Sequence, residues 1–213
     1  MVAKGAGGRG GRWGLLLAPG AGAGSDQAGL VAIDRAAAAA GFVVRRMDFP
    51  YRLAGRRAPD RPEVLVSAVM GEAASLAASA GVRPEKVFAG GRSMGGRMCS
   101  MAVASGMPAA GLVLVSYPLH PPGRPERLRT EHFARLELPC LFVSGTRDAF
   151  ATPGELEGCV SSVPGPVTLH LVEGADHSLR RREEEVAEVV TGWLVAQAGG
   201  RSGRAEQRGE AKG

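Results

Sequence analysis

The chain has 213 residues, 45% of them apolar, and a formal net charge of +5, which is the composition of a globular domain with a sizeable core. No apolar run reaches the roughly 18 residues of a membrane span, so we expect no membrane insertion. Aromatic residues make up only 5% of the chain, and much of the excess of positive over negative charge lies near its two ends. Both features argue against a nucleic acid as the principal partner.

The cysteines and the chain ends bear on location and organisation. The three cysteines form no Cys-x-x-Cys pair, which argues against a disulfide framework or a structural zinc site. The first residues lack the apolar core of a secretory signal, so we expect a cytoplasmic protein. Residues 1–12 and 199–213 are rich in glycine, arginine and glutamate. They are predicted to be disordered tails around one folded domain, residues 13–198.

Six short apolar runs along the folded part are predicted to be strands. Several are apolar on both faces, which is typical of a parallel sheet covered by helices on both sides. The runs are Trp13–Ala18, Phe42–Asp48, Lys86–Ala89, Leu112–Tyr117, Cys140–Ser144 and Val167–Val172.

Four longer segments carry the features of helices, most of them with apolar residues at three- and four-residue intervals. Asp60 and Glu63 predict a capping box at the start of the second one. Because strand and helix alternate, the sequence predicts an α/β fold, a three-layer α/β/α sandwich with about six mostly parallel strands. Ligands of such sheets bind beyond the carboxyl ends of the strands. The segments are Asp26–Ala40, Arg61–Ala80, Met94–Ser105 and a last helix that includes Val186–Leu194.

A Gly-x-Ser-x-Gly motif, Gly91–Gly95, follows the third strand and opens the third helix. This strand–turn–helix setting is the one that a nucleophile elbow requires, and it makes Ser93 the candidate nucleophile. The alternative is an ordinary glycine-rich turn that binds a phosphate.

A serine hydroxyl needs a base, and the base needs a third group that fixes its tautomer. Of the four histidines, His177 lies just past the last strand and before the last helix, which is the expected place for the base. The acid is predicted to be Asp148, which follows the fifth strand, and Asp176 is the rival. The bland alternatives are a surface or helix-capping histidine and a turn aspartate.

The oxyanion hole should use the backbone N–H of Met94, the residue after the nucleophile. A second N–H should come from the glycine-rich loop Pro19–Gly24 after the first strand, and we expect it to be that of Ala21. The alternative is a flexible loop that supplies no donor.

Four further residues are candidate substrate contacts: Arg52, Arg92, Tyr117 and His120. Arg52 follows the second strand, and Arg92 and Arg97 flank Ser93, so guanidinium groups could hold an anionic group of a small acyl substrate. The alternatives are solvated or structural arginines and simple loop packing for the other two residues.

Taken together, these motifs resemble the small cap-less α/β-hydrolases of the dienelactone-hydrolase-like family, a branch also similar to a non-specific-lethal complex subunit of animals. The resemblance implies the α/β-hydrolase fold and the triad Ser93, Asp148 and His177. The chain differs in having Pro19 where many members have histidine, and serine where dienelactone hydrolases use cysteine. The motifs are Pro19–Gly22, Asp48–Arg52, Gly91–Arg97, Tyr117–Pro122, Gly145–Asp148 and Asp176-His177.

The function predicted from these residues is a serine hydrolase that acts on an ester or related acyl substrate through an acyl-enzyme intermediate. No metal and no cofactor are expected. The segment from Pro118 to Pro139 is too short for a large cap domain. Two alternatives are a catalytically silent protein of the same fold that acts as a binding module, and an acyltransferase with the same triad.

Overall fold

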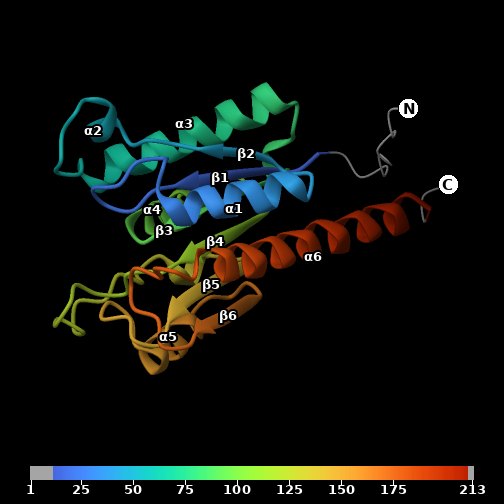
Figure 1. Ribbon diagram of the computed structural model, residues 1–213. Helices are drawn as coiled ribbons and strands as arrows, with labels where there is room; N and C mark the ends of the chain where they lie inside the picture. The colour runs from blue at the N-terminus through green and yellow to red at the C-terminus, as the bar shows by residue number, and fades with distance from the viewer. Residues whose placement is uncertain (1–11, 211–213) are drawn as a thin grey trace.

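The computed structural model describes residues 12–210 and the side chains of residues 12–200. Its centre is a six-stranded sheet in the order β2-β1-β3-β4-β5-β6, with every neighbouring pair parallel (Figure 1). Each strand lies within or overlaps one of the predicted runs. The strands are β1 Gly14–Ala18, β2 Val43–Arg46, β3 Val87–Arg92, β4 Gly111–Val115, β5 Cys140–Gly145 and β6 Val167–Val172.

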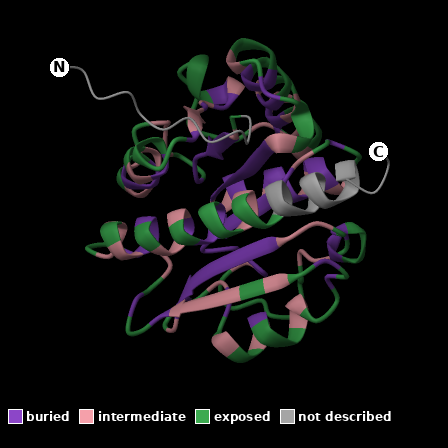
Figure 2. Ribbon diagram, turned by 90° about the vertical axis from the view of Figure 1, so that its right-hand side faces the viewer, coloured by how far each residue is buried: buried purple, intermediate pink, exposed green. Residues whose placement is uncertain are grey.

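The burial of the strands follows their place in the sheet. Strands β1, β4 and β5 are buried at every position, whereas the edge strands β2 and β6 are mostly half-buried, as Figure 2 shows for the sheet. Central strands covered on both faces must be apolar at every residue, which is why β4 reads Gly-Leu-Val-Leu-Val. The sequence prediction of a parallel sheet between two helical layers is confirmed.

The helices form one layer on each face of the sheet. Helices α1 and α6 lie side by side on one face (Figure 1) and share a core with the side chains of that face, including Leu15, Val113 and Val190. Helices α3, α4 and α5 cover the other core. The bounds are α1 Ala28–Ala39, α2 Pro50–Leu53, α3 Pro62–Ala80, α4 Met94–Ala104, α5 Pro153–Val160 and α6 Glu183–Glu210, with 3₁₀ turns at Pro84–Lys86 and Phe133–Arg135.

Helix α3 differs from the prediction in two ways. Within residues 12–210 it is the one helix that is long and apolar enough, by length and composition alone, to cross a membrane, although no such segment was expected. Here it buries Leu65, Val69 and Leu76 in the core. Its N-cap is Arg61, without a side-chain cap, so the capping box predicted at Asp60 is wrong. The Asp60 carboxylate is instead paired with Arg56 at 2.7 Å.

Helix α6 continues to Glu210, whereas a tail was predicted to begin at Gly199. The stretch Arg204–Arg208 contains Ala, Glu, Gln and Arg, which are strong helix formers, and this favours continuation of the helix. The rest of the predicted tails, residues 1–11 and 211–213, lies outside the described residues.

The order in which the chain adds strands to the sheet reverses between β1 and β3. Strand β2 pairs with one side of β1 and strand β3 with the other, and the residues that follow β1 and β3 line a common cavity there. The turn after β3 lies directly on the end of β1. A Cβ atom on Gly91 or Gly95 would come within 2.0 or 2.1 Å of the Ala18 carbonyl oxygen. Only glycine at both positions allows this approach.

The segment between β4 and β5 is fixed by polar contacts to its neighbours. The Ser100 Oγ atom of α4 lies 2.7 Å from His132 Nε2, and the Tyr117 hydroxyl donates to the Arg129 carbonyl at 2.7 Å. Both His132 and Tyr117 are buried. Burial, followed by the positive charge of Arg97, lowers the pKa of His132 to about 4. This segment is therefore an ordered strap and no cap domain.

The close approach at Gly95 yields a stability prediction. Gly95→Ala should lower the free energy of unfolding by about 3 kcal/mol or more, because the added methyl group meets a backbone carbonyl that cannot move aside. Gly71→Ala is the matched control in α3, where nothing lies within 4 Å of the added atom. It should raise stability by about 0.5–1 kcal/mol. Urea unfolding measures both, and equal effects of the two variants would contradict the packing argument.

Buried His132 yields a prediction of acid sensitivity. The unfolded chain has an imidazole pKa near 6.5 and the folded protein one of about 4, so the unfolded state binds the extra proton between these values. The stability from neutral His132 is complete above about pH 6.5 and is lost as pH falls towards 4. Between pH 7.5 and pH 5 the wild-type Tm should fall by roughly 4–8 °C more than that of His132→Gln. The same fall in both proteins would refute this.

Candidate active site

Ser93 stands in a strained backbone conformation between β3 and α4. Its φ of 51° and ψ of −117° are rarely adopted by a residue with a side chain. The conformation is held on both sides, because the Ser93 N–H donates to the Val115 carbonyl at 2.8 Å and the Ser93 carbonyl accepts the Arg97 N–H at 3.1 Å. The result is a sharp turn that presents the hydroxyl at the carboxyl end of the sheet.

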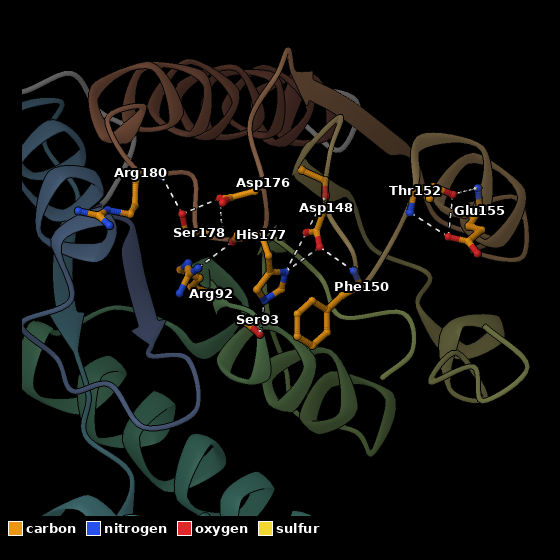
Figure 3. A network of polar contacts seen from close by, with 11 residues as sticks. Arg92, Ser93, Asp148, Phe150, Thr152, Glu155, Asp176, His177, Ser178 and Arg180 are labelled. Carbon is orange, nitrogen blue, oxygen red and sulfur yellow. Dashed lines mark hydrogen bonds and ion pairs between the residues drawn. The ribbon is translucent and has the colours of Figure 1, made fainter. Parts of the chain in front are cut away.

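The structure brings Ser93, His177 and Asp148 into one hydrogen-bonded chain (Figure 3). His177 Nε2 lies 3.0 Å from Ser93 Oγ, and His177 Nδ1 lies 2.9 and 2.8 Å from the two Asp148 carboxylate oxygens. The Asp148 side chain is fully buried, and that of His177 is 19% exposed. A buried carboxylate on Nδ1 keeps the proton on that nitrogen and leaves Nε2 free to accept the hydroxyl proton.

Asp148 and His177 are each fixed by a residue that the sequence did not single out, Phe150. The Phe150 N–H donates to Asp148 Oδ1 at 2.8 Å, and its ring stacks on the His177 imidazole with centroids 4.0 Å apart. Ser144 adds a longer hydroxyl bond of 3.4 Å to Asp148. The signal in the sequence that could have identified Phe150 is an aromatic residue two positions after Asp148. Together these contacts orient the imidazole.

Arg92 holds the loop that carries His177. Its Nη2 atom donates to the His177 backbone carbonyl at 2.7 Å, as Figure 3 shows. Burial lowers the pKa of the guanidinium, and the carboxylates of Asp148 and Asp176 partly offset this effect. Arg92 also borders the cavity in front of Ser93. The hydrogen bond to His177 gives Arg92 a positioning role, and its predicted contact with substrate stays a prediction.

The rival acid, Asp176, is turned away from the imidazole. It is exposed, and its Oδ1 accepts the N–H and the hydroxyl of Ser178 at 2.8 and 2.6 Å (Figure 3). These two bonds lower the pKa of Asp176. The neighbouring position in the sequence therefore does not give a contact with the ring.

Met94 and Ala21 both line the cavity in front of Ser93. In the part of the chain that the structure describes, neither N–H donates to another protein atom. The loop containing Ala21 is held in place on both sides, because the Gly20 N–H donates to Gln27 Oε1 and the Gly22 N–H donates to the Tyr51 hydroxyl, each at 3.1 Å. Two free donors on ordered backbone suit a developing oxyanion.

The cavity has a volume of about 500 Å³, within the range of small-molecule sites. Its walls combine apolar side chains with arginines, two of which come from α4 and from the segment after β4. Sequence reasoning found neither Arg129 nor the apolar walls. Besides the residues already named, the lining includes Pro59, Asp60, Pro62, Leu65, Arg97, Met98, Pro118 and Arg129.

Three predicted substrate contacts do not line this cavity. Tyr117 is buried between Phe133 and Phe142, where it packs as a core residue. His120 is buried with Nδ1 2.9 Å from the Pro121 carbonyl and Nε2 3.3 Å from Glu155. Arg52 is exposed on α2. All three follow strands as the prediction required, but their side chains leave the strand ends in other directions.

A second serine–histidine pair, Ser100 and His132, lies outside the cavity lining. The Ser100 hydroxyl donates to the Arg97 carbonyl at 2.8 Å, so it accepts the N–H of His132 Nε2 instead of giving that ring its proton. Both side chains are buried. This pair fits a structural role. Within the described residues, no group of three or more His, Cys, Asp or Glu side chains could hold a metal ion.

Solved structures with the same fold include three hydrolases. The chain aligns with Est1E from Butyrivibrio proteoclasticus in complex with ferulic acid at a TM-score of 0.74 and 15% identity, over 87% of this chain and 89% of that one. A monoacylglycerol lipase from Paleococcus ferrophilus aligns at a TM-score of 0.71 and 17% identity, over 86% and 94%. A dienelactone hydrolase from Anabaena variabilis aligns at 0.70 and 17%, over 88% of each chain.

At these identities the three likenesses establish the fold. The membership comes from the sequence itself, because the model of the family described as "Alpha/beta hydrolase domain" matches residues 11–194, nearly the whole folded part. This chain therefore belongs to the alpha/beta hydrolase domain family.

Proposed function

We propose that the protein is a serine hydrolase that cleaves carboxylic esters through an acyl-enzyme intermediate. The observation that carries the proposal is the hydrogen-bonded chain from Ser93 Oγ through His177 to buried Asp148, with distances of 3.0 and 2.8 Å. The strained turn at Ser93 and two free backbone donors beside it support the same chemistry.

In the first half of the reaction, His177 Nε2 takes the proton of Ser93 as Oγ attacks the ester carbonyl carbon. The carbonyl oxygen becomes an oxyanion, which the N–H groups of Met94 and Ala21 receive. Asp148 stabilises the imidazolium that forms. The oxyanion then collapses, the bond to the alcohol breaks, and His177 returns its proton to the leaving alkoxide.

In the second half, His177 acts as base towards water. The hydroxide that forms attacks the acyl carbon, the same two N–H groups hold the second oxyanion, and Ser93 leaves with the proton from His177. The carboxylic acid departs. Carboxylic esters are the favoured substrate class because two structures of the same fold are named Est1E, with ferulic acid bound, and monoacylglycerol lipase.

The nucleophile is tested by comparing the two serines that contact a histidine. Ser93→Ala should abolish labelling by a fluorophosphonate probe and lower kcat for a set of acyl esters, acetyl to octanoyl, by at least about 10³-fold. Ser100→Ala should keep both, because Ser100 already donates to the Arg97 carbonyl. Labelling that persists in Ser93→Ala would refute the assignment. A wild-type protein that neither labels nor hydrolyses any ester would favour the silent binding module.

The acid is tested by neutralising each of the two candidates. Asp148→Asn should lower kcat by about 10³- to 10⁴-fold, since an amide no longer fixes the tautomer or stabilises the imidazolium. Asp176→Asn should stay within about threefold of wild type, because that carboxylate contacts Ser178 and not the ring. Steady-state kinetics on the same ester, with melting temperatures as the folding control, separate the two. The reverse order would make Asp176 the acid.

A further inference from the structure

The guanidinium groups of two arginines in the wall of the cavity have no hydrogen-bond or ion-pair partner among the described residues. Arg97 lies on α4 one helical turn after Ser93, and Arg129 lies on the strap between β4 and β5. Among the described residues, neither guanidinium has a carboxylate within 4.0 Å. The Nε atom of Arg97 is buried and makes no hydrogen bond. A buried guanidinium N–H without an acceptor is costly, so it calls for one.

Other half-buried arginines of the chain have found such acceptors. Arg45 bonds to Ser75 at 2.8 Å and also pairs with Glu72, and Arg46 pairs with Asp34 at 2.8 Å. The arginine-rich composition therefore does not by itself explain unpaired guanidinium groups. They are a property of the cavity.

The two cations are also close enough to repel each other. Burial lowers the pKa of Arg129, and the positive charge of Arg97 lowers it further. Arg97 acts in the same direction on His132 behind the wall. Two like charges held together without a counter-ion form a site for an anion, because an anion between them relieves both the repulsion and the missing hydrogen bonds.

Hydrogen bonds within the protein hold the backbones of Arg129 and Arg97 in place. The Arg129 N–H donates to the Leu119 carbonyl at 2.8 Å, and its carbonyl accepts the Tyr117 hydroxyl at 2.7 Å. On the other side, the Arg97 carbonyl accepts the Ser100 hydroxyl at 2.8 Å. Both backbones are therefore anchored to buried side chains, which reduces the entropy lost on binding.

Asp60 is the one carboxylate among the residues that line the cavity, and it forms no ion pair with Arg97 or Arg129. Its Oδ1 pairs with Arg56 at 2.7 Å, whereas its buried Oδ2 makes no hydrogen bond among the described residues. The neighbouring walls, formed by Leu65, Met98 and Pro118, are apolar. The cavity thus combines a short apolar surface next to Ser93 with a cationic end, which fits a substrate that is apolar near its scissile ester and negatively charged at its other end.

We propose that Arg97 and Arg129 form an anion subsite, and that the substrates are esters with a carboxylate or similar small anion about one helical turn from the scissile bond. This inference rests on the proposed ester hydrolysis for its substrate class. The acyl and the alcohol arm of the experiment below distinguish an anion on the acyl part of the ester from one on the alcohol part.

The experiment compares matched pairs in which a carboxylate replaces a methyl group. The acyl pair is ethyl hydrogen glutarate against ethyl pentanoate, and the alcohol pair is the butyrate ester of β-hydroxypropanoate against propyl butyrate. In one pair, the wild-type kcat/KM should be at least about tenfold higher for the anionic ester. Arg97→Gln and Arg129→Gln should each lower that ratio by about tenfold, mainly through a higher KM for the anionic ester.

Two further variants sharpen the comparison. Arg97→Lys keeps the charge without the planar fork and should keep part of the preference. Arg124→Gln removes an exposed arginine from the same strap, outside the cavity lining, and should keep the whole ratio. A wild-type ratio near one in both pairs, or a ratio that survives loss of Arg97 and Arg129 together, would overturn the subsite while leaving ester hydrolysis intact.

A binding measurement keeps the subsite testable without turnover. Glutarate at about ten times its Kd should raise the Tm of the wild type and of Ser93→Ala by roughly 3–5 °C above sodium chloride of equal ionic strength. The Arg97→Gln and Arg129→Gln variants should lose this shift. A shift that persists in both variants, or is missing in the wild type, would overturn the subsite. Absence of ester hydrolysis together with an arginine-dependent shift would refute only the proposed function.

Discussion

The site depends on one close approach, that of the turn at Ser93 to the end of β1. A Cβ atom on Gly91 or Gly95 would lie only 2.0 or 2.1 Å from the Ala18 carbonyl oxygen. This contact lets α4 leave β3 at a sharp angle, and the strained backbone at Ser93 follows from it. It also brings the loop after β1, with the Ala21 N–H, to the same cavity as Ser93. The proposed nucleophile and the proposed oxyanion donors thus depend on one packing constraint.

The other two members of the hydrogen-bonded chain come from the same edge of the sheet by a different route. Asp148 follows β5 and His177 follows β6, and these parallel strands are paired in register up to Gly145 and Val172. Parallel strands deliver their carboxyl ends to one edge, so residues 29 positions apart can be placed within hydrogen-bonding distance. Arg92 then links the His177 carbonyl back to the end of β3. The loop that carries His177 is therefore held by Arg92, a residue outside the hydrogen-bonded chain of Ser93, His177 and Asp148.

The sequence predicts the residues that the sheet itself positions, but not those whose direction depends on other tertiary contacts. Ser93, Asp148 and His177 could be located because each follows an apolar run, and the sheet brings such positions together whatever the loops do. Tyr117 and His120 also follow a run, but their directions depend on the core and on Glu155, which the local sequence does not reveal. Short helix α5 was missed although Thr152 and Glu155 form its capping box. The predicted box at Asp60 failed because the N-cap is Arg61, one residue later, and the Asp60 carboxylate pairs with Arg56.

Arg129 illustrates what local patterns cannot contain. It lies in a segment without periodic apolar residues, and its place in the cavity follows from bonds to Tyr117 and Leu119 that exist only in the folded chain. The place of Arg97, in contrast, can be predicted from the sequence, because it lies one helical turn after Ser93. The absence of a carboxylate beside Arg97 cannot be predicted from the sequence. A charged pocket is thus a tertiary property even when its residues flank a recognisable motif.

The central claim is that the Ser93 oxygen itself becomes acylated, and acid-quenched mass spectrometry tests it most directly. After brief mixing with 4-nitrophenyl butyrate, the account predicts that the peptide containing Ser93 gains the mass of one butyryl group, and that the same peptide from Ser93→Ala does not. A butyryl group found on Ser100 would contradict it. Ester turnover without any acylated peptide, in the wild type and in a His177→Ala variant alike, would also contradict it.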